Sequence, residues 1–186
     1  MSTFFSDIQG FFKEQFDGRY IGIVLAEVSR VDPGPFRRFF AEVFHRPSYL
    51  EAQLAIDPEF SFRTPTGLRR ADLVVTLDGL PAALVELKFY DKLIPSTRST
   101  PTQLSDYLRV CRSEGFDFLL LSREPPTFAQ IEEIRGKRQH FAHFSQLAER
   151  LRASRHPASQ MLFEFLREKG VVSGTLEPGS LVQVLP

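Results

Sequence analysis

The chain has 186 residues, of which 42% are hydrophobic, and its formal net charge is zero. A chain of this length can bury the core of one domain, and its neutral composition does not by itself indicate a nucleic-acid-binding protein, since such domains are commonly basic. A single cysteine, Cys111, excludes an internal disulfide framework and a multi-cysteine zinc site. The N-terminal sequence has dispersed charges and no long apolar run, so we expect no signal peptide, no membrane span and a cytoplasmic location.

Three helices are predicted before the first strand. Apolar residues recur at helical spacing in residues 4–16 and predict an amphipathic helix that docks on the core, with a homodimer interface as the alternative. Residues 20–31 form a second helical pattern, and the text VDPGPF breaks it before a third helix begins near Pro35. Residues 51–62 are predicted to be extended chain that is interrupted at residues 57 and 58, and RTPTG closes this segment as a turn.

Residues 71–90, ADLVVTLDGLPAALVELKFY, predict a buried β-hairpin that nevertheless contains charged side chains. Both faces of its second strand are apolar up to Val85, after which Glu86 and Lys88 occupy successive positions on one face. If the turn is a three-residue loop at residues 78–80, residue 77 pairs with 81 and Asp72 lies opposite Glu86. A different loop length would move Asp72 to the other face unless a β-bulge restores the register.

The segments after the hairpin alternate between helix and strand. Residues 99–115 predict a helix, FDFLLLS a buried strand, residues 125–138 a helix and HFAHF a short strand, with two helices and a tail closing the chain. Tight turns give an antiparallel meander, and the strand–helix–strand step gives a crossover connection. We therefore predict a single α/β domain with a mixed central sheet and helices on both faces. Its N-terminal helices occupy residues 1–50, its core sheet residues 51–145, and its C-terminal helices and tail residues 146–186.

The charged residues of the hairpin suit a particular chemistry. The carboxylates of Asp72 and Glu86 are hard oxygen ligands of the kind that Mg²⁺ prefers, with Mn²⁺ as a substitute, and the carbonyl of Leu87 could add a third oxygen. Lys88 is no metal ligand while it is charged, but it can orient or help to deprotonate a water molecule and offset charge in a phosphoryl transition state. Phosphodiester hydrolysis is the reaction that fits this set best.

The residues Asp72, Glu86, Leu87 and Lys88 resemble the signature of the PD-(D/E)XK nuclease superfamily, although Ala71 stands where that signature has proline. The resemblance implies a restriction-endonuclease-like core in which Asp72 and Glu86 bind the metal and Lys88 is the catalytic lysine. It covers about residues 20–122. The order of the upstream helices, with VDPGPFRRFFAEVF, is similar to that of a large group of uncharacterised bacterial and phage-associated members.

A second motif supports the resemblance. Gln103 and Tyr107, spaced i and i+4 on the predicted helix after the hairpin, look like the Q-x-x-x-Y motif of the exonuclease-like branches. The resemblance implies that both residues position the substrate or support the metal cluster. Many members also use an acid from an upstream helix; Glu27, Glu42 and Glu51 are candidates here, and Glu27 is preferred because it lies in mid-helix among apolar neighbours.

Basic residues flank the hairpin on both sides. As a rim they could contact nucleic-acid phosphates, whereas as solvated loop charges they would need no explanation; they are Arg63, Arg69, Arg70, Lys92 and Arg98. Two histidines, His140 and His143, are three positions apart in a predicted strand and therefore on opposite faces, which argues against a shared metal.

Two hypotheses of different classes follow from these observations. The first is a Mg²⁺-dependent nuclease that hydrolyses DNA rather than RNA, in defence against mobile elements or in repair. The second is a catalytically silent module of the same fold that binds nucleic acid or a protein partner. A third arrangement, in which the chain is one part of a larger assembly, stays open. We expect no membrane partner.

Overall fold

The structure is a computed structural model, and it describes residues 5, 17–64, 67–89, 103–125, 131, 132, 134, 136 and 138–172. Over these residues the protein has one five-stranded sheet with the strand order β1-β2-β3-β4-β5. The first three strands form an antiparallel meander, and β4 and β5 extend the sheet parallel to β3. The predicted α/β class and mixed sheet are therefore confirmed.

The described strands are β1 (Leu54–Thr64), β2 (Gly67–Leu77), β3 (Leu80–Lys88), β4 (Asp117–Ser122) and β5 (Gln139–His143). The described helices are α2 (Asp17–Val31), α3 (Pro33–Val43), α4 (Ser48–Glu51), α5 (Gln103–Glu114), α7 (Phe144–Arg152) and α8 (Pro157–Glu168). Of the predicted helix at residues 4–16, only Phe5 is among the described residues, and its ring packs edge-on against Phe165 at 6.1 Å between centroids. The predicted tail strand and most of the predicted helix at 125–138 lie outside the described residues. No helix in the described ranges is long and apolar enough to cross a membrane.

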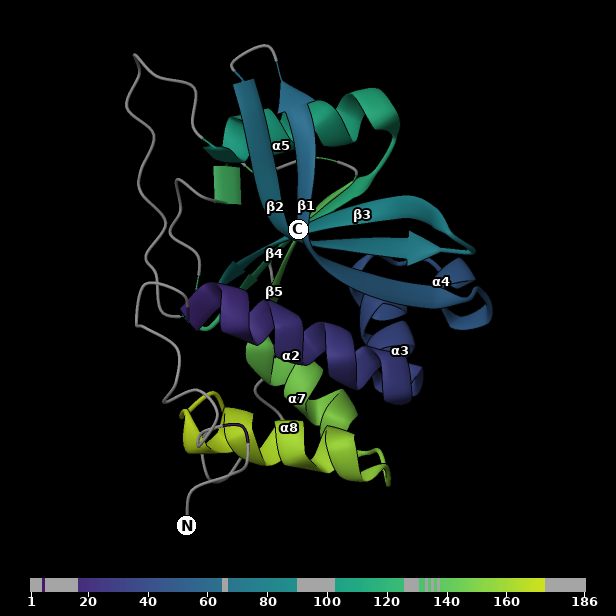
Figure 1. The fold of residues 1–186 in the computed structure, drawn as a ribbon, viewed down its shortest axis with the longest axis vertical. Coiled ribbons are helices and arrows are strands. Elements are labelled where there is room, and N and C mark those ends of the chain that lie inside the picture. The colour runs from purple at the N-terminus through teal and green to yellow at the C-terminus, as the bar shows by residue number, and fades with distance from the viewer. Residues whose placement is uncertain are drawn as a thin grey trace.

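Helices cover both faces of the sheet (Figure 1). On one face, α2, α3, α7 and α8 enclose a large apolar cluster with side chains such as Leu73, Val85 and Leu119. On the other face, α5 encloses a second cluster that includes Val74, Leu84 and Leu120. Strand β4 is buried at all of its positions because both of its faces are covered, which explains the apolar run at residues 118–121.

The turn between β2 and β3 differs from the prediction. Leu77 pairs with Leu80, not with residue 81, so the loop has two residues, Asp78 and Gly79, and both have a positive φ, at 52° and 80°. This is the conformation that Asp-Gly favours in a tight hairpin. The register then shifts between Thr76–Pro81 and Val75–Ala83, which leaves Ala82 as an extra residue in β3. The β-bulge compensates for the short loop. From Val75 back toward Asp72, β2 therefore pairs with β3 in the predicted register.

Strand β1 runs without interruption through Asp57 and Pro58, so the predicted break is wrong. Asp57 and Pro58 nevertheless lie directly before a bend in β1. Pairing with β2 passes from Pro58–Leu73 to Phe60–Ala71 and omits Glu59, which has a φ of 62°. On β2 the side chains change sides here, because Ala71 packs in the α5 cluster and Leu73 in the opposite one. The end of the β1–β2 hairpin therefore turns toward α5, as Figure 1 shows.

Candidate functional site

The candidate site lies where β2 and β3 separate. Their pairing ends at Leu73 and Val85, whereas β1 and β2 continue to pair as far as Thr64 and Gly67. Beyond the last β2–β3 pair, the backbone N–H of Leu87 donates a hydrogen bond to Asp72 Oδ2 at 2.7 Å. A side-chain oxygen of Asp72 thus satisfies the strand N–H and holds the Asp72 carboxylate against β3.

Glu86 and Lys88 complete the cluster on β3. Glu86 is buried, with 4% of its surface exposed. Its Oε1 forms an ion pair with Lys88 Nζ at 2.8 Å, and the Lys88 side chain is 16% exposed. Glu86 Oε2 is also buried and receives no hydrogen bond from any donor in the described part of the chain. Lys88 therefore compensates the charge on one oxygen of the Glu86 carboxylate, and no donor among the described residues compensates the other. This arrangement is destabilising, because a buried charge is costly unless it is paired.

Burial makes both acids hold their protons more strongly than usual. Burial and, to a lesser extent, the negative charge of Asp72 raise the pKa of Glu86 to about 7, against the opposing effects of the Lys88 ammonium and the Tyr107 hydroxyl. Burial also raises the pKa of Asp72 above its ordinary value, although the Leu87 amide, Lys88, Glu86 and Arg70 oppose this rise. Near neutral pH the two carboxyl groups thus favour either a bound proton or another positive charge between them.

The oxygen atoms present fit a divalent cation of the Mg²⁺ type. Asp72 and Glu86 each supply a carboxylate, and the uncompensated Glu86 Oε2 leaves one buried acceptor for a cation. In a β-strand, the N–H and C=O groups of one residue point to the same side. The Leu87 N–H points toward Asp72, so the Leu87 carbonyl also lies on the side of β3 that faces Asp72. In the described part of the chain, no group of three or more His, Cys, Asp and Glu side chains could hold a metal, so such a site rests on two acids and a carbonyl.

Helix α5 supports this cluster from one side. Tyr107 is buried, and its hydroxyl donates a 2.6 Å hydrogen bond to the backbone carbonyl of Arg70, two residues before Asp72. Tyr107 therefore fixes the backbone of β2 next to the site, a role that the motif alone did not specify. Gln103 is the first residue of α5, and its side chain lies outside the described part of the structure.

The basic residues predicted as a rim have different environments. The Nε of Arg69 donates a 2.8 Å hydrogen bond to Oδ2 of Asp106 on α5, and Asp106 is fully buried. Arg70 is 53% exposed and lies 3.6 Å from Glu59 Oε1. Arg63 is exposed. Lys92 and Arg98 lie outside the described residues.

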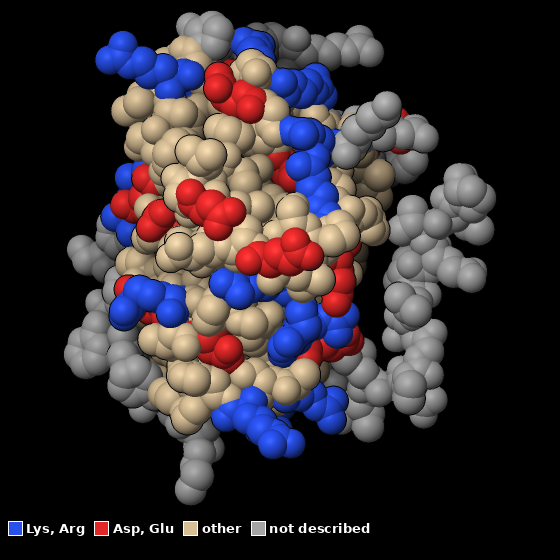
Figure 2. All heavy atoms as spheres, turned by 90° about the vertical axis from the view of Figure 1, so that its right-hand side faces the viewer, with Lys and Arg blue, Asp and Glu red and all other residues tan. Residues whose placement is uncertain are grey.

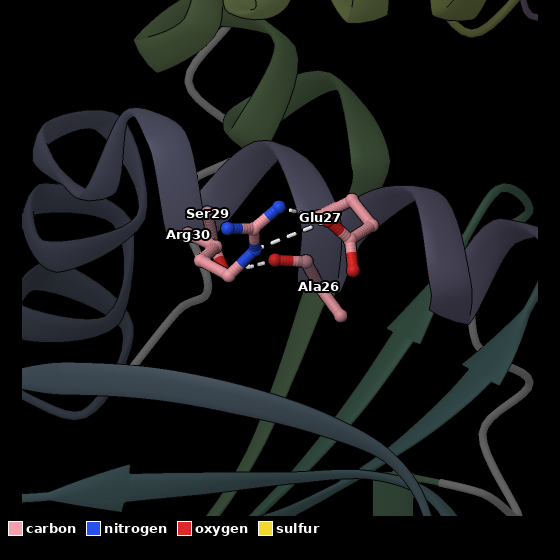
Figure 3. Close-up of polar contacts among 4 residues, drawn as sticks. All are labelled: Ala26, Glu27, Ser29 and Arg30. Atoms are coloured by element: carbon pink, nitrogen blue, oxygen red, sulfur yellow. Dashed lines mark hydrogen bonds and ion pairs between the residues drawn. The ribbon is translucent and has the colours of Figure 1, made fainter.

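Glu27, the preferred extra acid, is exposed on α2. Its Oε2 accepts hydrogen bonds from Nε and Nη2 of Arg30 at 3.1 and 2.8 Å, as Figure 3 shows. The two side chains are 62% and 72% exposed, so the acid that was expected to need a buried partner is solvated and paired one turn along its own helix. Of the other two candidates, Glu42 pairs with Arg150 at 2.6 Å and Glu51 is exposed at the end of α4. The structure does not bring any of these three acids into a metal-holding group with Asp72 and Glu86.

Sequence reasoning missed two acids near the site, Glu59 and Asp106. Glu59 lies at the bend of β1, between the pairs Pro58–Leu73 and Phe60–Ala71, and forms ion pairs with Arg19 and Arg70. The proline before Glu59 was a signal that the strand bends there. Asp106 lies directly before Tyr107 on α5, and its position beside the apolar stripe of that helix was the available signal.

The two histidines have separate structural roles. The His140 ring packs edge-on against Phe44 at 5.2 Å between centroids. His143 is the N-cap of α7, where its Nδ1 accepts a hydrogen bond from the backbone N–H of Ser145, and its Nε2 contacts the Arg123 carbonyl. Neither of these contacts is with the candidate site.

No family model, curated protein or solved structure matches this chain. The case for a function therefore rests on the residues and geometry of the site alone.

Proposed function

We propose that the protein is a Mg²⁺-dependent phosphodiesterase that hydrolyses DNA, built on a restriction-endonuclease-like core. The observation that carries this proposal is the buried Glu86 carboxylate. One of its oxygens pairs with Lys88 and the other has no donor in the described residues, while Asp72 lies beside it. Two acids and a lysine that are clustered and largely buried at the end of the β2–β3 pairing suit phosphoryl chemistry better than they suit packing.

Asp72, Glu86 and the Leu87 carbonyl would hold the cation, whose chemistry is to polarise a phosphate oxygen and acidify water. The Leu87 N–H orients Asp72, and Tyr107 fixes the β2 backbone nearby. Glu86 keeps the Lys88 ammonium at the site, where it can stabilise negative charge that develops on the phosphate. Gln103 stays a proposed substrate-positioning residue.

The proposed reaction conserves atoms and charge. The oxygen of a water molecule bonds to phosphorus, and the bond between phosphorus and one sugar oxygen breaks. The attacking water loses a proton, and the leaving oxygen gains one. Lys88 lies where charge accumulates during this exchange, so it contributes to the rate more than to the binding of DNA.

The test is to incubate the protein with labelled plasmid, linear DNA and RNA in the presence of Mg²⁺, Mn²⁺ or EDTA, and to measure cleavage and binding at one salt concentration. Lys88→Ala should lower the cleavage rate by roughly 10²- to 10³-fold, the usual effect of removing one transition-state electrostatic contact, with nearly unchanged affinity. Lys169→Ala removes an ammonium at the end of α8 and should leave the rate near that of the wild type. Cleavage that is insensitive to EDTA and to Lys88→Ala would contradict the proposal.

A catalytically silent module is the second candidate. It is favoured by the lack of a third acidic ligand among the described residues. Figure 2 adds that basic and acidic side chains are interspersed on the face it displays, with no broad basic field. Binding of DNA or of a protein partner without cleavage of any substrate would support this candidate.

A further inference from the structure

The end of the β1–β2 hairpin forms an arm beside the candidate site, and we define the arm as residues 60–64 and 67–71. These residues pair with each other beyond the point where β2 leaves β3. The arm begins directly after the bend at Glu59 and ends directly before Asp72. Whatever binds the arm is therefore next to the two candidate metal ligands.

One face of the arm is anchored to α5. Phe60 and Phe62 pack on the α5 cluster, and the ring of Phe62 lies 5.5 Å from that of Tyr107 between centroids. Arg69, on the same face, donates its hydrogen bond to the buried Asp106. These contacts fix the arm and leave its opposite face open.

The outward face has a different composition. By register, Arg63 lies opposite Leu68 and Ser61 lies opposite Arg70, so these four side chains share a face. Leu68 is 69% exposed and the Arg70 side chain 53% exposed. Arg63 is exposed, and its side chain makes no hydrogen bond or ion pair within the described residues. The face has two guanidinium groups and one apolar side chain, and it contains no acid.

Glu59 lies at the base of the arm and holds Arg70. Its Oε1 is 3.6 Å from Nη1 of Arg70, and it also pairs with Arg19 of α2. Two arginines, Arg19 and Arg70, thus share a single carboxylate, which leaves a local excess of positive charge. A guanidinium at this distance from its acid can still donate its other N–H groups to a phosphate.

We infer that the outward face of the arm binds a DNA strand next to the candidate catalytic cluster. Arg63 and Arg70 contact phosphates, and Leu68 contacts a sugar or base. This inference rests on the proposed nuclease function and identifies the side from which its substrate enters. Because phosphate contacts contain no sequence information, binding by the arm is independent of sequence. Arg69, although it is the neighbour of Arg70 in sequence, is a structural residue of the arm and not a DNA contact.

The chain offers matched controls for this surface. Arg152 and Arg155 are exposed near the start of α8, and Figure 1 shows that α7 and α8 lie on the opposite side of the molecule from the arm. The double variant R152A/R155A changes the net charge by the same amount as R63A/R70A. Leu80, the first residue of β3, is 71% exposed and is the control for Leu68.

The experiment measures the affinity for short labelled duplex and single-stranded DNA over a series of salt concentrations, and cleavage at saturating DNA. R63A/R70A should weaken binding roughly tenfold and reduce the salt dependence, the slope of log affinity against log salt, by about 2, since each phosphate contact contributes about 0.9. The cleavage rate at saturating DNA should stay near that of the wild type in the control variant R152A/R155A. Leu68→Ser should weaken binding, whereas R152A/R155A and Leu80→Ser should not.

The outcomes separate the arm from the proposed function. Equal losses in the arm and control variants, or no loss in the arm variants while the wild type cleaves DNA, would overturn the inference and leave the nuclease proposal intact. Arm-dependent binding without cleavage would support the inference and contradict the nuclease proposal. If the wild type neither binds nor cleaves DNA, both proposals fail. If the double variant misfolds, the single variant Arg63→Ala still tests the inference, because the Arg63 side chain has no partner to lose among the described residues.

Discussion

Glu86 is a buried acid whose negative charge is only partly compensated by its neighbours. A buried carboxylate is destabilising when charged, and Glu86 has one oxygen paired with Lys88 and one without a donor in the described part of the chain. The neighbouring Asp72 adds a second negative charge. Such a residue weakens the fold unless a proton or a cation relieves it, which is why the site suggests function and not only packing.

The burial of Glu86 predicts how the stability of the protein depends on pH. Burial raises the pKa of Glu86 in the folded protein from 4.5 to about 7. Between these two values the folded state binds more protons than the unfolded state, so the free energy of unfolding must fall as pH rises. Below the lower value the group is protonated in both states, and above the higher value it is ionised in both. In EDTA, the wild type should therefore lose up to about 3 kcal/mol from this group between pH 5 and pH 8.

Urea unfolding at both pH values, compared between the wild type and Glu86→Gln, isolates the effect from the other carboxyl groups. Because glutamine does not ionise, the variant should lack this loss and gain stability relative to the wild type as pH rises. Parallel pH profiles for the two proteins would contradict the raised pKa.

At the scale of elements, the attachment of α5 to the β1–β2 hairpin determines where Asp72 lies. Tyr107 bonds to the Arg70 carbonyl, and Asp106 bonds to the side chain of Arg69. Both contacts join α5 to residues that immediately precede Asp72. Helix α5 thus holds strand β2, which contains Asp72, in place.

Two arginines of the same hairpin should therefore differ in their contribution to stability. Arg69→Ala leaves the fully buried Asp106 without its Arg69 hydrogen bond, and we expect a loss of about 2 to 3 kcal/mol. Arg63→Ala alters an exposed side chain on the outward face and should change stability by less than about 0.5 kcal/mol. Chemical denaturation of both variants measures the difference, and equal stabilities would show that the Arg69–Asp106 contact does not hold the arm.

The sequence predicted those elements whose patterns are set by burial. Residues 118–121 are continuously apolar because both faces of β4 are covered, and the stripe from Leu104 to Cys111 is apolar because α5 has one buried side. The opposition of Asp72 and Glu86 could be predicted only conditionally. The loop is one residue shorter than expected and the bulge at Ala82 compensates for it, and no local pattern indicates a bulge that lies three residues from the turn.

The burial of individual charged side chains was beyond prediction for a different reason. Glu27 lies in an apolar stretch of sequence, yet its position on the helix surface exposes it, and Arg30 is its partner. Conversely, Arg69 and Arg70 are adjacent and chemically identical, but the strand directs one toward Asp106 and the other toward solvent. Such differences depend on which face of a strand is covered, and coverage is settled by elements far away in the chain.

At the scale of the whole molecule, the candidate site lies between two apolar layers. One cluster lies beneath α2, α3, α7 and α8, and the other beneath α5, and the two meet at the sheet. Glu86 is a member of the central strand β3, which has neighbours on both sides. A charge imbalance at this position therefore acts on the stability of the entire domain and not only on one loop.

Divalent cations should consequently stabilise the whole fold. A ligand that binds only the folded state, at a concentration about 100 times its Kd, adds about 2.7 kcal/mol to the free energy of unfolding, which raises the Tm of a chain of this size by roughly 5 to 10 °C. We expect this shift for the wild type at pH 8 with Mn²⁺ or Mg²⁺ relative to EDTA. Asp72→Asn and Glu86→Gln should lose the shift, because each removes a ligand charge.

Two control variants make this measurement specific. Glu42→Gln removes an exposed acid that pairs with Arg150 and should retain the full shift. Lys88→Ala should also retain it, since the lysine is not a ligand, and the loss of its positive charge strengthens the attraction of the two acids for a cation. Equal shifts in the wild type and in Asp72→Asn would place the cation elsewhere on the protein. That result would remove the structural basis for a metal-dependent reaction at Glu86, whatever activity the protein has.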